Sequence, residues 1–300
     1  MSSYTKRYVE VGDIKFACYD EGPRQNQAIV LLHGMPTSCY LWRKVIKELS
    51  NTWRCIAPDL VGMGDTVCSS DERFDLAAQA TAIANLCRKL ELRRILVVGH
   101  DIGGGVAQYL ALRHESLVSG LALVDSACYD NWPVGVIRTL RGAASMGRGF
   151  GAFFRLGLAK KLAYSQRGFR RGVKHPGSLG PNQIDEYIRP YQLSATGRQR
   201  LQNMVRSLSN VQTREIANEF YRFTKPVLVV WALDDAFFPL IWAERLATDF
   251  PNSDLRTISD CGHFVPEERP RQLAIHIDRL AKSILNSSDA STTTTEGYEP

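Results

Sequence analysis

Short runs of consecutive apolar residues recur along this chain, and between them apolar residues repeat every three or four positions. Such runs are typical of strands buried on both faces, and the longer repeat is typical of helices that cover a sheet. Strands are expected at 8–11 and 14–19, which alternate as a hairpin, and at 28–32, 55–57, 95–98, 121–124, 227–231 and, more weakly, 255–258. Helices are expected at 41–49, 76–90, 104–113, 240–248 and 269–285. This alternation predicts an α/β fold with a mostly parallel central sheet and helices on both faces.

The strand pattern stops between residues 127 and 224, where the sequence is helical in period and rich in Gly and Arg. Because this stretch separates two predicted strands, we expect a helical cap inserted over the strand ends, where α/β sheets bind their ligands. The predicted core is therefore 1–126 together with 225–287. The last residues, 288–300, are rich in Ser and Thr and predict a disordered tail.

The pentapeptide Gly99-His100-Asp101-Ile102-Gly103 stands between a predicted strand and a predicted helix. It has the small-x-nucleophile-x-small pattern of a strained strand-to-helix turn, in which the central residue is usually serine. Here the centre is Asp101. A carboxylate that attacks an acyl group would form an anhydride, whereas one that attacks a saturated carbon forms an alkyl ester that water can cleave. The substitution therefore favours epoxide opening or carbon–halogen cleavage over acyl transfer.

The peptide His33-Gly34-Met35-Pro36 follows the predicted strand 28–32. A backbone N–H there, that of Met35, can pair with the N–H of Ile102 to form an oxyanion hole. Pro36 is then a candidate for contact with the substrate.

Two later segments supply an acid and a base. Asp235 follows the predicted strand 227–231, and His263 lies in the loop before the final helix. The order Asp101, Asp235, His263 matches the nucleophile–acid–base order of hydrolases with this turn. Asp234, beside Asp235, and Asp125, after the strand 121–124, are the alternatives for the acid.

Together these four motifs resemble the α/β-hydrolase family from about residue 8 to residue 285. The Asp nucleophile narrows the resemblance to the branch that holds epoxide hydrolases and haloalkane dehalogenases. The resemblance implies that Asp101 becomes an ester, that His263 activates the water that cleaves it, and that Asp235 orients the imidazole. It also implies an acid four residues after a strand-end tryptophan; Trp231 and Asp235 have this spacing.

Dehalogenases of this branch resemble one another in two halide-binding side chains that are replaced here. The tryptophan after the nucleophile is Ile102, and the asparagine after the His-Gly pair is Met35. Trp132, early in the cap, is a candidate source of an indole N–H. Epoxide hydrolases instead protonate the opened ring from cap tyrosines, and Tyr187 and Tyr191, four residues apart, would share one helix face.

The preferred hypothesis is therefore a cofactor-free epoxide hydrolase that acts on a small apolar organic molecule and yields a vicinal diol. Phe264, beside His263, is a further candidate for substrate contact. A haloalkane dehalogenase with an atypical halide site is the second hypothesis. A non-catalytic ligand-binding protein and a lyase on the same fold are the others, although a binding protein has no need of all three of Asp101, Asp235 and His263.

Composition narrows the class of protein further. The 300 residues allow a large core plus an insertion, and no apolar run approaches the roughly 18 residues that a membrane span needs. The seven cysteines have no metal-like spacing, and the N-terminal residues lack an apolar signal core. We therefore expect reduced thiols, a cytoplasmic location, and neither a metal nor a cofactor.

The predicted cap is strongly basic, because no acidic residue lies between Asp130 and Asp185. The basic residues in that stretch are Arg138, Arg141, Arg148, Arg155, Lys160, Lys161, Arg167, Arg170, Arg171 and Lys174. Such a segment could attract an anionic membrane surface or an acidic substrate; a solvated outer face over an apolar tunnel is the favoured interpretation. No nucleic-acid motif accompanies the charge, so nucleic acid is not an expected partner. The sequence carries no indication for or against oligomers.

Overall fold

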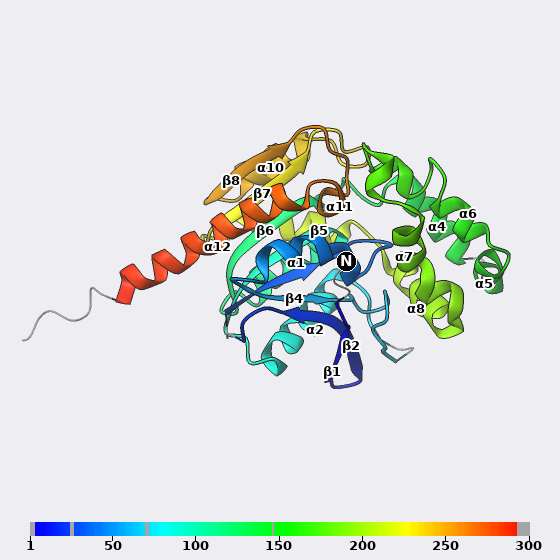
Figure 1. Ribbon diagram of the computed structural model, residues 1–300, viewed down its shortest axis with the longest axis horizontal. Coiled ribbons are helices and arrows are strands. Elements are labelled where there is room, and N and C mark those ends of the chain that lie inside the picture. The colour runs from blue at the N-terminus through cyan, green and yellow to red at the C-terminus, as the bar shows by residue number, and fades with distance from the viewer. Residues whose placement is uncertain (1–3, 25–26, 70–71, 146, 293–300) are drawn as a thin grey trace, which may run out of the picture.

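The computed structural model describes residues 4–24, 27–69, 72–145 and 147–292, and it contains one eight-stranded sheet within these residues (Figure 1). The strands are β1 (Arg7–Val11), β2 (Ile14–Glu21), β3 (Gln27–Leu32), β4 (Arg54–Pro58), β5 (Arg94–Asp101), β6 (Val118–Ser126), β7 (Val227–Ala232) and β8 (Ser253–Ile258). Their order in the sheet is β1-β2-β4-β3-β5-β6-β7-β8. β2 is antiparallel to both of its neighbours, and every other adjacent pair is parallel. The predicted fold class and the predicted hairpin are confirmed.

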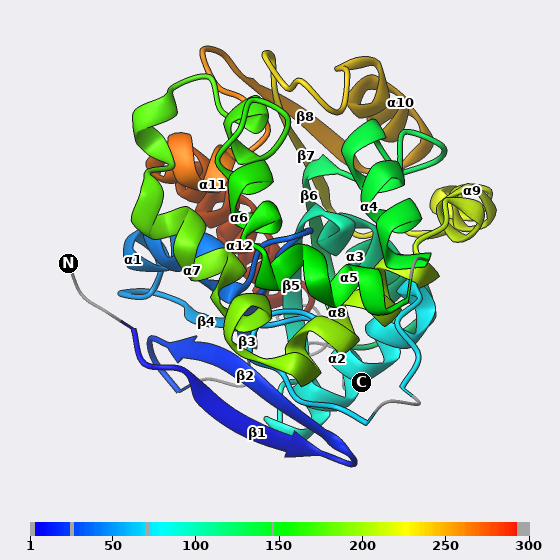
Figure 2. The ribbon, with the colours of Figure 1, turned by 90° about the vertical axis from the view of Figure 1, so that its right-hand side faces the viewer.

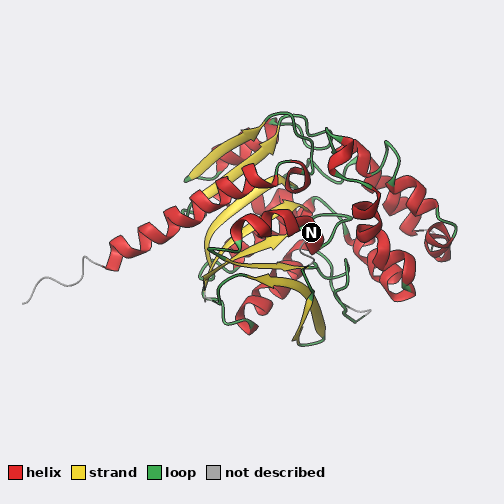
Figure 3. Cartoon of the chain, viewed as in Figure 1, coloured by secondary structure: helices red, strands yellow, loops and turns green. Residues whose placement is uncertain are grey.

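Helices cover both faces of the sheet (Figure 3). The α-helices of the described residues, including those that do not lie on the sheet, are α1 (Arg43–Leu49), α2 (Leu76–Lys89), α3 (Ile102–Arg113), α4 (Gly135–Ser145), α5 (Arg148–Arg155), α6 (Leu158–Ala163), α7 (Pro181–Leu193), α8 (Ala195–Ser207), α9 (Val211–Ala217), α10 (Ile241–Asp249), α11 (Val265–Glu268) and α12 (Pro270–Thr292). Alternate residues of β5 enter the two apolar cores. Leu96 and Val98 pack in the core of α1 and α12, whereas Ile95 and Val97 pack in the core of α2 and α3. Burial on both faces explains why the strand is apolar at every one of these positions.

Helices α4 to α9 lie between β6 and β7 in the sequence and form what we call the insertion, residues 127–224. Most of these helices stand together beyond one edge of the sheet, where the parallel strands end (Figure 1), and the view in Figure 2 looks onto them. No strand occurs in the described part of the insertion, in keeping with the helical pattern of its sequence. The insertion therefore covers the carboxyl ends of β3, β5, β6 and β7, which precede the motifs singled out above.

The C-terminal helix differs from the sequence-based prediction. α12 continues to Thr292, so the predicted tail is wrong for residues 288–292, and residues 293–300 lie outside the described part of the chain. After Pro270, the next glycine or proline is Gly297. The sequence therefore offers no helix-stopping residue at the predicted boundary.

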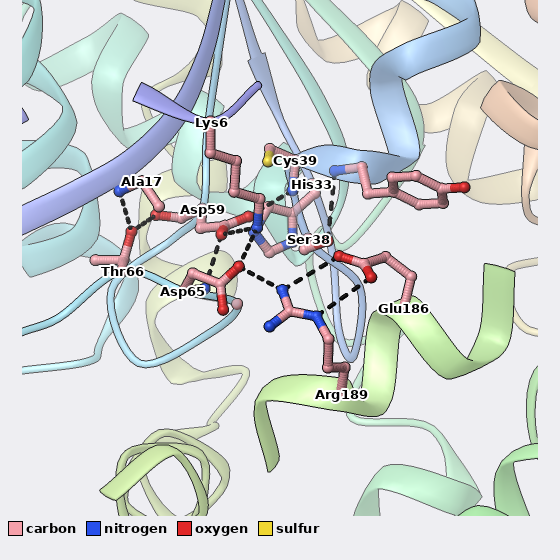
Figure 4. Close-up of polar contacts among 12 residues, drawn as sticks. Lys6, Ala17, His33, Ser38, Cys39, Asp59, Asp65, Thr66, Glu186 and Arg189 are labelled. Atoms are coloured by element: carbon pink, nitrogen blue, oxygen red, sulfur yellow. Dashed lines mark hydrogen bonds and ion pairs between the residues drawn. The ribbon is translucent and has the colours of Figure 1, made fainter. Parts of the chain in front are cut away.

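An ion-pair cluster joins the insertion to the N-terminal segment and to the loop after β4 (Figure 4). Nζ of Lys6 lies 2.8 Å from Oδ2 of Asp59 and 2.7 Å from Oδ2 of Asp65. Nη2 of Arg189, on α7, lies 2.6 Å from the same Asp65 oxygen. The side chain of Asp59 is fully buried, and it also accepts the backbone N–H of Cys39. We call these four charged residues, Lys6, Asp59, Asp65 and Arg189, the latch.

Two members of the latch, Lys6 and Asp65, are charged at neutral pH. Burial alone would lower the pKa of Lys6, but the neighbouring carboxylates more than offset it and raise that pKa well above its ordinary value. Burial would likewise raise the pKa of Asp65, but Lys6 and Arg189 hold it below its ordinary value. A depressed carboxyl pKa stabilises the fold above the unfolded-state pKa, and that stabilisation is lost as the pH falls through the folded-state pKa.

Replacing Lys6 by Met should lower the free energy of unfolding by about 3 kcal/mol, because Asp59 would remain buried without its cation. Urea unfolding at neutral pH measures this change. The matched control is Lys15→Met in the adjacent hairpin strand, where Nζ lies 3.8 Å from Glu10 and both side chains are exposed. That control should lose less than about 0.5 kcal/mol. Equal midpoints for the two variants would contradict a stabilising role for the latch.

Candidate active site

The turn between β5 and α3 holds Asp101 in a strained conformation, with φ of 54°. The flanking glycines make the turn sterically feasible. A Cβ on Gly99 would lie 2.3 Å from the carbonyl oxygen of Gly103, and one on Gly103 would lie 2.4 Å from that of Leu32. Both distances are far below van der Waals contact, so the small residues two positions either side of Asp101 are required by space. The turn projects the Asp101 carboxylate beyond the strand end.

The two oxygens of this carboxylate have different surroundings. Oδ1 accepts the backbone N–H of Met35 at 3.0 Å, and Oδ2 lies 3.5 Å from Nε2 of His263. Gly34 allows this approach, because a Cβ there would lie 2.3 Å from Cβ of Asp101. Ile102 begins α3 directly after Asp101, at the helix end where backbone N–H groups are free of intrahelical partners. One oxygen is thus held by the backbone while the other faces the imidazole.

The imidazole of His263 meets Asp235 rather than Asp234. Nδ1 of His263 donates to Oδ2 of Asp235 at 2.8 Å. The other oxygen of Asp235 accepts the backbone N–H groups of Phe237 and Phe238, at 2.7 and 3.1 Å. Asp234 instead pairs with Lys174, 2.9 Å away, on the exposed side of the loop. Of Asp234 and Asp235, the acid that contacts the imidazole is therefore Asp235, as its spacing from Trp231 predicts.

Asp125, the third candidate for the acid, has a different environment. Its Oδ1 accepts the N–H of Ala232 at 2.8 Å, and its buried Oδ2 has no hydrogen-bond partner among the described residues. Burial and the charge of Asp235 raise the pKa of Asp125 well above its usual range. The hydrogen bond of Asp125 goes to the backbone of β7, whereas the imidazole of His263 bonds to Asp235, so the geometry gives the role of the acid to Asp235.

The charges of Asp101 and His263 stabilise each other. Burial lowers the pKa of His263, but the charge of Asp235 and the hydrogen bonds of Asp101 and Asp235 raise it well above its ordinary value. Burial raises the pKa of Asp101, and the contact with His263 lowers it below its ordinary value. In the free protein the ring of His263 therefore lies between two carboxyl groups, an arrangement that favours its charged form.

Two other histidines support this arrangement from within the core. Nε2 of His100 lies 2.9 Å from the carbonyl oxygen of His263, and the two rings lie 4.7 Å apart. Burial and the charge of His263 lower the pKa of His100 to about 4, so this ring is neutral. Nε2 of His33 accepts the backbone N–H of Leu60. Both rings position backbone rather than face the cavity.

Asp101 and His263 line a cavity of about 120 Å³. Met35, Pro36, Tyr191 and Phe264, four of the residues predicted to contact substrate or to supply a backbone N–H to the oxyanion hole, are also in its lining. Apolar side chains of the insertion and the ring of Phe237 make up most of the rest, among them Ile137, Leu140, Phe153, Phe169 and Leu201. Among all lining residues, only Asp101, Tyr191 and His263 carry polar side chains. The cavity is suited to an apolar molecule that reacts at one end.

Trp132 and Tyr187, two of the predicted substrate-contact residues, do not line this cavity, so the structure does not bring them to Asp101. The indole N–H of Trp132 donates to Oγ1 of Thr213 at 2.8 Å. The hydroxyl of Tyr187 donates to Oε1 of Glu267 at 2.6 Å, in a fully buried site. In both cases a partner from a distant part of the sequence captures the polar atom. Only Tyr191, one helical turn further along α7, faces the cavity.

Sequence reasoning did not identify the lining that the insertion provides. Ile137 and Leu140 on α4 have the three-residue spacing of one helix face, and Phe153 lies in an aromatic cluster on α5. This periodicity marks the apolar faces of the helices. It does not say which of those faces meets Asp101, because that depends on how the helices pack.

The described residues match neither the pattern of a metal site nor that of a membrane-spanning helix. No cluster of three or more His, Cys, Asp or Glu side chains that could hold a metal ion occurs there. Of the helices described, none is long and apolar enough to cross a membrane.

The fold and the turn that carries Asp101 define a class of protein, and comparison with known families gives the same class. Residues 27–270 match the family model of the alpha/beta hydrolase fold, so the chain belongs to this family.

The relatives that the chain resembles within the family are named for two different activities. The chain is 30% identical over 251 residues to the soluble epoxide hydrolase of Corynebacterium sp. (strain C12), a match that covers 81% of this chain and 86% of that protein. It is 26% identical to haloalkane dehalogenase 2 of Mycobacterium tuberculosis (strain ATCC 25618 / H37Rv), over 86% of this chain and 88% of the relative. Among solved structures, the epoxide hydrolase CorEH without ligand aligns with a TM-score of 0.76 and 25% identity, covering 94% of this chain and all of the other.

The geometry predicts how the pKa of His263 responds to its two carboxylates. Asp101→Asn removes one of the negative charges that favour the imidazolium, so the pKa of His263 should fall. NMR titration of the histidine ring resonances measures the change directly. Asp234→Asn is the matched control, because Asp234 pairs with Lys174 and should leave the pKa of His263 in place. An unchanged pKa in the Asp101 variant would contradict the proximity of the two groups.

Proposed function

We propose that this α/β hydrolase is an epoxide hydrolase that acts on small apolar epoxides through a covalent ester on Asp101. The observation that carries the proposal is the pairing of two features in one cavity. Asp101 has one oxygen held by the Met35 N–H and the other 3.5 Å from Nε2 of His263, and Tyr191 supplies the only side-chain hydroxyl among the lining residues. The first is a nucleophile for saturated carbon, and the second is a proton donor for the alkoxide that ring opening creates.

In the first step, Oδ2 of Asp101 attacks a ring carbon and forms a C–O bond. The ring C–O bond breaks, and its electron pair stays on the departing oxygen. Tyr191 gives its proton to that oxygen. The backbone N–H of Gly64 donates to the Tyr191 hydroxyl oxygen at 3.1 Å, which leaves the hydroxyl hydrogen free to point into the cavity. Burial raises the pKa of Tyr191, so the hydroxyl is protonated before the reaction.

Formation of the ester changes the role of His263. Asp101 loses its negative charge, so one of the two carboxylates that stabilise the imidazolium is gone, and the pKa of His263 falls. The proton that His263 then releases passes to the Tyr191 oxygen and restores the hydroxyl that protonated the opened ring. The net charge of the site is unchanged, and the neutral imidazole is ready to act as a base.

In the second step, His263 takes a proton from water as the water attacks the carbonyl carbon of the ester. The negative charge that develops falls on Oδ1, where the N–H groups of Met35 and Ile102 stabilise it. Collapse of this intermediate releases the diol oxygen, which takes the proton back from His263. Asp235 holds the imidazole through Nδ1 in both steps. The overall reaction adds one water to one epoxide.

The same cavity is poorly equipped for a halide. A departing halide needs N–H donors, and no Trp, Asn or Gln side chain occurs among the lining residues. The 30% identical epoxide hydrolase from Corynebacterium supports the proposed chemistry. The mycobacterial dehalogenase keeps carbon–halogen cleavage as the second candidate, and one experiment distinguishes the two.

His263→Gln should trap the ester, because hydrolysis needs the base while alkylation does not. Intact-mass spectrometry after exposure to a panel of epoxides and haloalkanes should show a gain equal to one whole epoxide. A gain equal to a haloalkane minus hydrogen halide would identify a dehalogenase instead. The matched control is the double variant Asp101→Asn/His263→Gln, which should gain no mass. Adducts on both variants, or on neither, would contradict Asp101 as the nucleophile.

Tyr191→Phe should lower kcat for epoxides by about 100-fold, because a general acid contributes roughly that factor or more. Steady-state kinetics on the best epoxide of the panel measure the change. Tyr164→Phe is the matched control, since the Tyr164 hydroxyl donates to the carbonyl of Pro181 away from the cavity. That variant should stay within about twofold of the parent. Full activity in the Tyr191 variant would exclude this residue as the proton donor.

A further inference from the structure

A second and larger hollow, of about 1000 Å³, adjoins the candidate active site. Four arginine side chains of the insertion line it: Arg138, Arg141, Arg167 and Arg171. We call this hollow the arginine vestibule. Asp130 contributes the only carboxylate among its lining residues. The vestibule therefore has an excess of positive charge.

The vestibule and the apolar cavity share a wall. Val134, Leu162 and Phe237 line both hollows. Phe237 lies between one of the arginines and the base: the guanidinium of Arg171 lies 5.8 Å from the ring centroid, and the ring of His263 packs edge-on at 5.1 Å. A molecule with its reactive end at Asp101 would therefore leave the cavity beside the arginines.

Arginines with and without acidic partners both occur elsewhere in this chain, so what distinguishes these four is that they gather around one hollow. Within the described residues, no ion pair involves any of them, whereas Arg73, Arg113, Arg222 and Arg256 all pair with carboxylates on the exposed surface. Arg138 donates to the carbonyl oxygen of Pro133 at 3.2 Å, which leaves its charge uncompensated. An ordinary solvated face mixes both signs of charge. A concentration of one sign at the mouth of an apolar cavity instead attracts an oppositely charged ligand.

We propose that the preferred substrate is an anionic amphiphile: an epoxide whose apolar chain fills the cavity and whose carboxylate lies in the arginine vestibule. This inference rests on the proposed function and names its substrate class. Guanidinium groups bind carboxylates through paired, charge-assisted hydrogen bonds, which suits arginine better than lysine for this task. Val134, Leu162 and Phe237 would flank the chain between its two ends.

The test compares an acid with its uncharged counterpart. Epoxyundecanoic acid, with the ring at the far end of the chain, is assayed beside its primary amide, and the measured quantity is the ratio of their kcat/KM values. In the parent protein this ratio should exceed one. Arg138→Gln/Arg171→Gln should lower it about tenfold, as expected for the loss of hydrogen bonds to a charged group.

The matched control is Arg155→Gln/Arg170→Gln, which removes the same charge from the insertion at two exposed positions outside the vestibule. Its ratio should stay close to that of the parent. Equal losses in the two double variants would attribute the preference to overall charge and overturn the vestibule as the binding site. Epoxybutanoic acid, with a much shorter chain between ring and carboxylate, should show a smaller preference over its amide.

Binding of decanoate, which cannot react, separates this inference from the proposed function. Isothermal titration calorimetry at low salt should show binding that weakens about tenfold in Arg138→Gln/Arg171→Gln and little in the control. If no epoxide is turned over but decanoate binds in this way, the proposed function fails and the carboxylate site stands. If epoxides are turned over, the acid has no advantage and decanoate binding ignores the vestibule arginines, the substrate class is wrong and the proposed function stands.

Discussion

The site depends on one steric constraint, the close approach of the Asp101 turn to the end of β3. Gly34, Gly99 and Gly103 have no side chains where a Cβ would come within 2.3 to 2.4 Å of neighbouring atoms. Because these three positions have no side chain, the loop after β3 can bring the Met35 N–H to Asp101, and α3 can begin immediately after Asp101. The backbone thus fixes one carboxylate oxygen without using a side chain. The position of His263 and the shape of the cavity then follow from the ends of neighbouring strands.

Much of this arrangement could be predicted from the sequence, because it rests on local pattern. Apolar runs marked the buried strands, and β8, the weakest prediction, is an edge strand with alternating exposure. Motif order brought together Asp101, Asp235 and His263. What failed depended on partners far away in the chain. Tyr187 and Tyr191 lie on the same helix, but the hydroxyl of Tyr187 donates a hydrogen bond to Glu267. The spacing of residues along α7 cannot predict this distant partner. The predicted end of α12 differs from the structure for a local reason. The polar composition of residues 288–292 was interpreted as disorder, although none of these residues stops a helix.

The insertion combines two kinds of surface that serve different ends. Its inner faces are apolar and close the cavity over Asp101, which removes water from the developing charges and strengthens every electrostatic interaction there. Its rim carries guanidinium groups without acidic partners among the described residues. The basic stretch that looks like a solvated face in the sequence is thus divided in space between ordinary surface and the mouth of a site. Only the packing of the helices distinguishes the two.

The latch has a consequence for how such insertions can be exchanged between family members. α7 carries Tyr191 toward the cavity and Arg189 toward Asp65, so one helix is oriented from both sides. An insertion grafted from another hydrolase would bring a new lining, but without a cation at the place of Arg189 it would leave Lys6 facing two carboxylates, Asp59 and Asp65. The graft would then sit in an altered orientation even with an ideal lining. The insertion is therefore not an independent module. Its orientation depends on Lys6, which lies in the N-terminal segment, far from the insertion in the sequence.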